Sequence, residues 1–141
     1  MLQDTLKKAG TSMIGLDTGF FIRFLENNKD AVQTWRGVIE GEESCVSCLS
    51  IFELSRLSLR GIIDAETTDL LIEAILSMCT VVWLDEKEIL LTGARLSHGL
   101  NIPAMDALIL AGFIMLNAGT IYTTDSHLEG FKKKGVKVFR L

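Results

Sequence analysis

Proline is almost absent from this sequence, and no apolar run in it is long. One proline among 141 residues excludes a Pro-rich linker. The longest apolar tract, residues 107–116, is too short to span a bilayer and is expected to form a buried core helix. The first residues lack the apolar region of a secretory signal. We therefore expect one compact domain that works in the cytoplasm, away from membranes.

Cysteine is also scarce. The three thiols, Cys45, Cys48 and Cys79, are an odd number without a dense framework, which is typical of a reducing compartment. Cys45 and Cys48 have C-x-x-C spacing, but a zinc site needs about four ligands. The sequence has no second pair of this kind and no neighbouring histidine pair. Buried thiols are therefore expected.

Positive charge is not in excess, because the formal net charge is −4. Bulk charge therefore cannot hold a nucleic acid, and any such contact needs a local patch, bridging metal ions or a partner subunit. The only basic run, residues 132–134, is expected to be the solvated end of a helix over residues 128–134, near the negative pole of its dipole. Arginines that are candidates for phosphate contacts, without a basis for ranking them, are Arg23, Arg56, Arg60 and Arg95.

Short apolar runs alternate with amphipathic segments along the chain. Strands are predicted over residues 13–16, 45–49, 80–84, 120–124 and 136–139. Helices are predicted over residues 20–26, 31–39, 50–59, 64–78, 86–97, 103 to about 117, and 128–134. This alternation predicts an α/β fold of three α/β/α layers with a mostly parallel sheet. We assign residues 1–12 to an N-terminal extension and residues 13–141 to the domain.

Acidic residues follow the predicted strands or occupy the first turns of helices: Asp17, Glu53, Asp106 and Asp125. Each has a structural explanation: Asp17 and Asp125 as helix caps, Glu53 as the second member of a capping box, and Asp106 beside a helix dipole. Together they point to a site, because the carboxyl ends of parallel strands meet at one edge of the sheet. Crowded carboxylates raise one another's pKa, and a hard divalent cation such as Mg²⁺ or Mn²⁺ relieves that repulsion. Such a site is suited to phosphodiester hydrolysis.

Four segments, taken in order, resemble the successive motifs of PIN-domain ribonucleases, and most closely those of VapC-type toxins from toxin–antitoxin pairs. They are Leu16-Asp17-Thr18, Ser50-Ile51-Phe52-Glu53-Leu54, the segment 102–111 around Asp106, and Thr123-Thr124-Asp125. The resemblance covers residues 13–141. It implies a PIN fold and a Mg²⁺- or Mn²⁺-dependent endoribonuclease. It also implies RNA as the substrate, a homodimer and a small antitoxin partner.

The resemblance also implies roles for single residues. Catalytic and metal-binding roles carry over to Asp17, Glu53, Asp106 and Asp125. Thr123 matches the family's hydroxyl before the last acid and is expected to orient ligands, with Thr18 in support. Two positions depart from the pattern: His127 stands where many members have a further acid, and Gly19 where Ser or Asn is frequent. These departures leave the number of metal ions open.

Other interpretations stay open at this point. A receiver-like signalling domain would need paired acids after the first strand, where this chain has only one. A PIN-like module that binds RNA or a partner without cleavage, or an RNA-processing nuclease outside a toxin–antitoxin pair, is compatible with the same residues. His98 and His127 are expected to be ordinary surface or satisfied side chains, and Trp35 and Trp83 to pack in the core. Apolar residues in segments 20–25 and 64–78 predict a dimer surface.

Overall fold

The computed structural model describes residues 13–141, so the predicted extension over residues 1–12 lies outside the described residues. Its sheet has five strands in the order β3-β2-β1-β4-β5, and every neighbouring pair is parallel. The strands are β1 (Ile14–Leu16), β2 (Ser44–Ser47), β3 (Thr80–Val82), β4 (Thr120–Thr123) and β5 (Lys137–Arg140).

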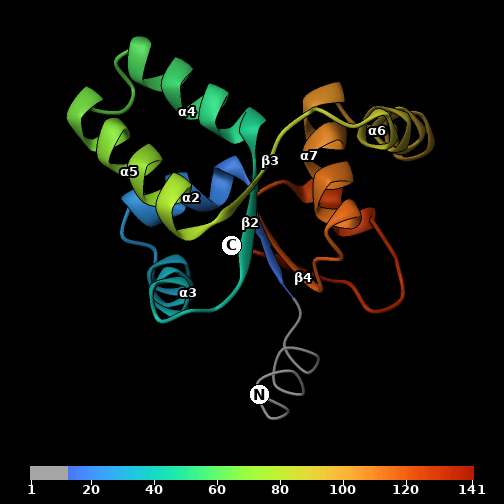
Figure 1. Ribbon diagram of the computed structural model, residues 1–141, viewed down its shortest axis with the longest axis horizontal. Helices are drawn as coiled ribbons and strands as arrows, with labels where there is room; N and C mark the ends of the chain where they lie inside the picture. Colours follow the sequence, from blue (N-terminus) through green and yellow to red (C-terminus); the bar gives the residue numbers. More distant parts are fainter. Residues whose placement is uncertain (1–12) are drawn as a thin grey trace.

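Helices connect the strands and cover both faces of the sheet (Figure 1). They are α2 (Thr18–Leu25), α3 (Lys29–Ile39), α4 (Cys48–Leu59), α5 (Ala65–Met78), α6 (Lys87–Leu100), α7 (Ala104–Met115) and the 3₁₀ helix η1 (Ser126–Gly130). Helices α2 to α5 lie on one side of the sheet, and α6 and α7 on the other. The predicted three-layer α/β/α architecture is therefore confirmed. None of the helices within residues 13–141 combines the length and the apolar character that crossing a membrane requires.

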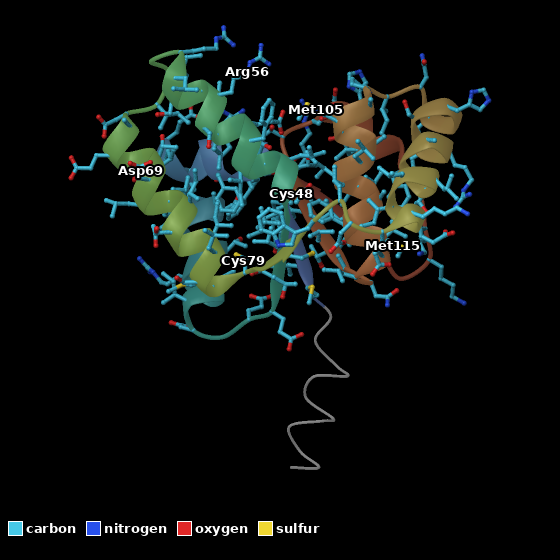
Figure 2. The ribbon with its side chains drawn as sticks, turned by 45° about the horizontal axis from the view of Figure 1, so that its top comes forward. Cys48, Arg56, Asp69, Cys79, Met105 and Met115 are labelled. Atoms are coloured by element: carbon cyan, nitrogen blue, oxygen red, sulfur yellow. The ribbon has the colours of Figure 1, made fainter. Side chains whose placement is uncertain are left out.

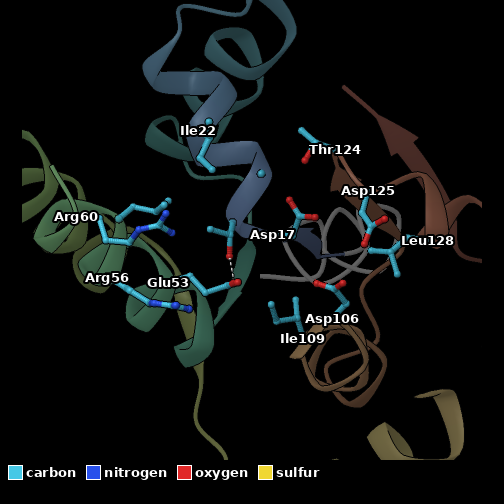
Figure 3. Close-up of a pocket in the computed structure, with 13 residues that line it drawn as sticks. Asp17, Ile22, Glu53, Arg56, Arg60, Asp106, Ile109, Thr124, Asp125 and Leu128 are labelled. Carbon is cyan, nitrogen blue, oxygen red and sulfur yellow. Dashed lines mark hydrogen bonds between the residues drawn. The ribbon is translucent and has the colours of Figure 1, made fainter. Parts of the chain in front are cut away.

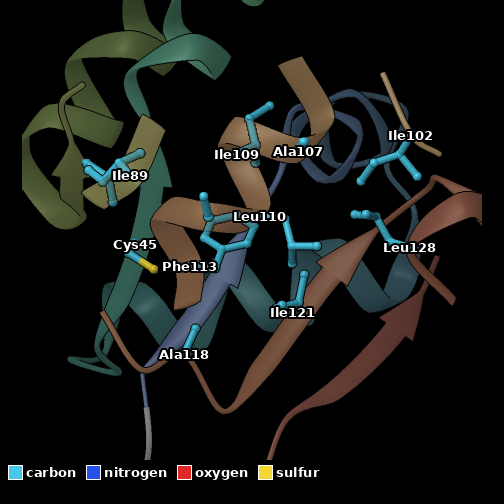
Figure 4. Packing of buried hydrophobic residues seen from close by; sticks show 12 residues of the cluster. Cys45, Ile89, Ile102, Ala107, Ile109, Leu110, Phe113, Ala118, Ile121 and Leu128 are labelled. Carbon is cyan, nitrogen blue, oxygen red and sulfur yellow. The ribbon is translucent and has the colours of Figure 1, made fainter. Parts of the chain in front are cut away.

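The longest apolar tract forms α7, the helix between the sheet and α6 (Figure 2, where Met105 and Met115 mark its two ends). Leu110 and Phe113 of α7 are fully buried and pack with Ile121 of β4 and Cys45 of β2 (Figure 4). A Cβ atom on Gly15 of β1 would lie 2.8 Å from the Phe113 ring, so this strand position has room only for glycine. The predicted core helix is confirmed.

The opposite face of the sheet is covered by an aromatic core. Phe20 and Phe21 of α2 are fully buried, and the Phe21 and Trp35 rings meet edge to face with centroids 5.7 Å apart. In α5, Leu71 and Ile75 point to the sheet, whereas Leu70 is 67% exposed. The prediction that Leu70 and Met78 face inward is wrong, because the buried row of α5 continues from Leu71 and Ile75 to Thr68, at helical spacing.

Three further predictions need correction. Trp83 is 54% exposed and not in the core, because the edge strand β3 ends at Val82 and leaves the indole beyond the sheet. Cys48 begins α4 instead of ending a strand, since the Ser47 side chain caps that helix. The third is the prediction of buried thiols. Cys45, Cys48 and Cys79 are free, but only Cys45 is buried, whereas Cys48 and Cys79 lie at helix ends and keep partial exposure. Burial raises the pKa of Cys45 to about 12.

The predicted helix over residues 128–134 is also wrong. The chain forms the short 3₁₀ helix η1, and Phe131 then adopts an extended backbone. Gly130 ends η1 and Gly135 has a φ of +84°, so the segment turns back to begin β5 and cannot continue as a helix. The lysines at 132–134 therefore lie in a loop, and the helix dipole does not account for them.

Candidate active site

A pocket of about 530 Å³ opens at the carboxyl edge of the sheet (Figure 3). The acids predicted from the sequence all line it: Asp17, Glu53, Asp106 and Asp125. They come from different parts of the chain, namely the end of β1, the second turn of α4, the first turn of α7 and the end of β4. The fold therefore brings together carboxylates that are far apart in the sequence.

Asp17 is fixed in place by two hydrogen bonds. Its Oδ1 accepts from the Phe20 backbone N–H at 2.9 Å, as expected for the N-cap of α2. Its Oδ2 accepts from the Thr123 hydroxyl at 2.5 Å. The residue is only 8% exposed, and burial raises the pKa of Asp17 to about 6 despite both hydrogen bonds. The nearby charges of Asp125 and Glu53 add to this rise in the pKa of Asp17.

Thr123 links the first and last acids of the pocket. Besides donating to Asp17, its fully buried hydroxyl oxygen accepts from the Asp125 backbone N–H at 2.9 Å. A single hydroxyl thus sets the spacing between the ends of β1 and β4, which are neighbouring strands. The orienting role that the resemblance implies for Thr123 stays a prediction, and these two hydrogen bonds are the contacts through which it would act.

Glu53 does not belong to a capping box. Because α4 begins at Cys48, both Ser50 and Glu53 lie inside the helix and neither caps its start. The Thr18 hydroxyl of α2 instead donates a hydrogen bond to Glu53 Oε1 at 2.5 Å and lies 2.9 Å from the Ser50 hydroxyl. The Glu53 carboxylate therefore faces the pocket across from α2 (Figure 3).

Asp106 and Asp125 form the other side of the pocket. Burial raises the pKa of Asp106 to about 6, and a hydrogen bond and charge from Asp125 add to the rise, followed by the charges of Glu53 and Asp17. Asp125 caps η1, since its Oδ1 accepts from the His127 backbone N–H at 2.8 Å. The same oxygen lies 2.9 Å from His127 Nδ1. The neighbouring carboxylates thus disfavour the ionisation of Asp106.

The structure ranks the arginine and histidine candidates. Arg56 and Arg60 lie on the same face of α4 as Glu53 and line the pocket. Arg23 instead pairs with Glu26 and Arg95 with Glu88, both on exposed surface outside the pocket. His98 is exposed on α6 and does not line the pocket either. The spacing from Glu53 to Arg56 and Arg60, three and seven residues, places them on one helical face and is the pattern in the sequence that could have ranked these arginines.

A close contact between two segments of the pocket wall was not predicted from the sequence. Gly19 and Thr124 line its wall, and a Cβ atom on Gly19 would collide with the Thr124 side chain. The close approach of these two segments explains why a serine or asparagine at position 19 is not accommodated here. Nothing in the sequence alone indicated this contact between α2 and the end of β4.

The carboxylates do not form a preformed metal site. Within residues 13–141, no group of three or more His, Cys, Asp or Glu side chains is already placed to hold one ion. Two of the acids are bound to threonine hydroxyls and a third to His127. The donor chemistry nevertheless suits a hard cation, because carboxylate oxygens surround one cavity. The raised pKa values of Asp17 and Asp106 show that negative charge is disfavoured there without a counter-ion.

Comparisons with solved structures identify toxin–antitoxin proteins with the same fold. A toxin–antitoxin complex from Klebsiella pneumoniae matches with a TM-score of 0.70 and 15% identity, over 91% of this chain and 99% of that chain. VapBC2 from Rickettsia felis, bound to a promoter DNA fragment, matches with a TM-score of 0.69 and 15% identity, over 91% and 98%. VapBC-1 from nontypeable Haemophilus influenzae matches with a TM-score of 0.64 and 17% identity, over 91% and 97%. At these identities the likeness establishes a shared fold.

The sequence comparisons are more direct. No curated protein matches the chain. The family model of the PIN domain matches residues 14–134, which include every acid of the pocket. The resemblance noted in the sequence motifs is thereby confirmed, and this chain belongs to the PIN domain family.

Proposed function

We propose that this protein is a metal-dependent endoribonuclease that hydrolyses RNA phosphodiester bonds as a VapC-type toxin in the cytoplasm. The observation that carries the proposal is the convergence of Asp17, Glu53, Asp106 and Asp125 on one pocket. Membership of the PIN family supports nuclease activity, and the toxin–antitoxin neighbours support the toxin assignment.

The same acids are proposed to hold Mg²⁺ or Mn²⁺. Bound there, the metal would neutralise phosphate charge and lower the pKa of a water molecule that attacks phosphorus. The hydroxyls of Thr18 and Thr123 donate hydrogen bonds to Glu53 and Asp17, but these bonds do not remove the repulsion that neighbouring carboxylates exert on Asp17. A cation replaces that repulsion with attraction, so binding is expected to shift Asp17 and Asp106 fully to the ionised form.

Residues around the acids hold them in position. Thr123 fixes Asp17 relative to the Asp125 backbone, and Thr18 fixes Glu53. These hydroxyl contacts limit the rotamers of the acids, which reduces the entropy lost when ligands bind. Arg56 and Arg60 lie beyond Glu53 on α4, where their guanidinium groups are placed to bind phosphates next to the bond that is cut.

Asp106→Asn tests this proposal. Wild-type protein is expected to bind Mn²⁺ and to cleave single-stranded RNA, with both activities abolished by EDTA. In Asp106→Asn, cleavage should fall by at least about 100-fold because a ligand oxygen is lost. Asp69→Asn is the matched control, since this exposed acid lies on α5 (Figure 2) and does not line the pocket. Undiminished cleavage by Asp106→Asn would refute the assignment.

A small antitoxin is the proposed protein partner. A second hollow, of about 490 Å³, is lined by Ile22, Leu25, Leu57, Ile62 and Ile63, and Ile22 and Leu57 also line the acid pocket. An apolar segment of an antitoxin placed there would reach the acids. Co-expression with a neighbouring short reading frame should yield a stable complex that Ile62→Asp weakens. Absence of such a reading frame would favour an RNA-processing nuclease instead.

A homodimer is also proposed. The predicted contribution of α2 is reduced, because Phe20 and Phe21 are already buried in the monomer core. On α5, however, Leu70, Leu76 and Met78 are each at least 45% exposed. These side chains are the part of the predicted surface that remains available for a second copy of the chain.

One observation favours a second candidate function, a PIN-like binding module without cleavage. His127 Nδ1 lies 2.9 Å from Asp125 Oδ1, so the imidazole occupies a position beside an oxygen that a bound cation would need. If the contact between His127 and Asp125 prevents metal binding and cleavage, His127→Ala should raise the affinity for Mn²⁺ and produce cleavage. If wild-type protein already cleaves RNA, this candidate is excluded.

A further inference from the structure

A hollow of about 630 Å³ beside strand β5 gathers positive charge in this acidic protein. We call it the basic hollow and define it by its cationic residues, Lys132, Lys133, Lys134, Lys137 and Arg140. All of these side chains are exposed. The single acid in its lining, Glu129, pairs with Arg140 at 3.4 Å. The basic hollow therefore has a strong positive charge, although the chain has a net charge of −4.

The fold gives no structural reason for this concentration of lysines. The run at 132–134 is in a loop, so it does not stabilise the end of a helix. Within residues 13–141, none of the lysines of the basic hollow forms an ion pair. Neighbouring like charges repel one another and cost stability. A polyanion bound in the hollow would offset that cost.

The basic hollow adjoins the acid pocket. Leu128 of η1 lines the acid pocket, and Glu129, the next residue, lines the basic hollow. Arg140 is paired in register with Thr123, the residue that links two of the acids. An extended ligand that leaves the acid pocket over η1 therefore enters the basic hollow. On the other side of the acids, Arg56 and Arg60 supply positive charge on α4.

We propose that the basic hollow is a docking surface for the phosphates of a single-stranded RNA on one side of the cleavage site, an inference that rests on the proposed function. Lysine ammonium groups bind phosphates as mobile point charges and do not select a sequence. Phe131 and Val138 lie among them and offer an apolar surface to bases or riboses. The surface explains how a chain with net negative charge holds a substrate of the same sign. It contributes affinity for long RNA and leaves the chemical step to the acids.

The test compares two variants with the same change in net charge. The first replaces the lysines of the basic hollow, Lys132→Gln, Lys133→Gln and Lys134→Gln. The control replaces exposed cations outside both sites, Lys29→Gln, Arg36→Gln and Lys87→Gln. Binding of a fluorescent single-stranded RNA of mixed sequence is measured in EDTA over a range of salt concentrations, so that cleavage does not interfere.

The first variant should bind at least about tenfold more weakly than wild type at 0.1 M salt, with the slope of log K against log[salt] reduced by about 2. The control should stay within about twofold, as expected if local rather than bulk charge matters. Equal affinity of the first variant and wild type would overturn the proposal, and so would equal weakening by both variants. Equally tight binding of polyglutamate by wild type would overturn the RNA assignment in favour of an acidic protein partner.

A cleavage assay separates this proposal from the proposed function. With Mn²⁺, a dinucleotide, whose one phosphate occupies the acid pocket and leaves none for the basic hollow, should be cut equally well by wild type and the first variant. Long RNA should show a raised KM and an unchanged kcat in that variant. A wild-type protein that binds RNA through the hollow but cuts nothing would refute the nuclease function and leave the docking surface standing.

Discussion

Replacement of the buried acid Asp17 by asparagine should stabilise the metal-free protein at neutral pH. Burial raises the pKa of Asp17 from 3.8 to about 6, so the folded protein binds this proton more tightly than the unfolded chain does. The resulting stability is present below about pH 4 and is lost as the pH rises through about 6. An asparagine side chain does not titrate, so the Asp17→Asn variant does not share this loss.

The size of the effect follows from the two pKa values of Asp17, 3.8 and about 6. Linkage gives a loss of about 1 kcal/mol at pH about 4.5 and about 3 kcal/mol at pH about 7.5. The advantage of Asp17→Asn over wild type should therefore grow by about 2 kcal/mol between these pH values. An asparagine still accepts from the Phe20 N–H but its amide NH₂ cannot accept from Thr123. The stability lost with the Thr123 hydrogen bond is the same at both pH values, so it cancels when the two pH values are compared.

Urea unfolding in EDTA, followed by the fluorescence of the buried Trp35, measures the free energy of unfolding at each pH. Asp69→Asn removes an exposed acid of α5 outside the pocket, and its effect should be the same at both pH values. The reasoning is refuted if Asp17→Asn shows no greater advantage at pH about 7.5 than at pH about 4.5. Added Mn²⁺ should stabilise wild type and leave Asp17→Asn almost unchanged, because binding to the folded state alone shifts the equilibrium.

Further substitutions test the framework of the site and the surface of the molecule. Thr123→Val leaves the partly buried Asp125 N–H without its acceptor, and we expect a loss of about 1–3 kcal/mol in urea unfolding. Mn²⁺ binding in calorimetry should also weaken, and unchanged Mn²⁺ affinity would argue against an orienting role. Gly15→Ala should lower the free energy of unfolding by about 1–3 kcal/mol because its Cβ would collide with the Phe113 ring. The control Gly99→Ala, with open space around it on α6, should be neutral or slightly stabilising, and equal effects of the two variants would contradict the packing argument. Leu70→Glu should convert the proposed dimer to a monomer in light scattering without lowering the thermal midpoint of the monomer, and a monomeric wild type would remove the dimer proposal.

The order of elements and the position of the acids were predictable from local sequence patterns. Asp17 and Asp125 follow short apolar runs that form β1 and β4, and strands of a parallel sheet deliver their carboxyl ends to one edge. Asp106 lies in the first turn of an apolar helix, and its carboxylate faces the pocket. These predictions needed only the period of the apolar residues and the direction of the strands.

Element boundaries and side-chain partners were less predictable, because tertiary contacts decide them. Ser50 and Glu53 match the capping-box pattern, yet Ser47 caps α4 three residues earlier. Trp83 follows an apolar strand and is exposed because β3 lies at the edge of the sheet, a fact about strand order that no local pattern contains. The basic hollow likewise depends on β5 bringing Lys137 and Arg140 next to a loop.

Capping and ligand binding are not alternatives for the acids of this pocket. Capping uses Oδ1 of Asp17 and Oδ1 of Asp125, and each cap fixes the direction in which the other carboxylate oxygen points. Oδ2 of Asp17 then accepts a hydrogen bond from the Thr123 hydroxyl, and Asp125 lies close enough to Asp106 to raise the pKa of Asp106. A helix N-terminus also carries partial positive charge, which stabilises an anion beside it. Capping therefore stabilises negative charge at the sheet edge. Because the pKa values of Asp17 and Asp106 are still raised, the free-energy cost of ionising these two carboxyl groups in the folded protein is only partly offset. The remaining cost is what a bound cation would remove, so the same carboxylates that weaken the metal-free fold at neutral pH are the ones expected to give the protein its affinity for metal.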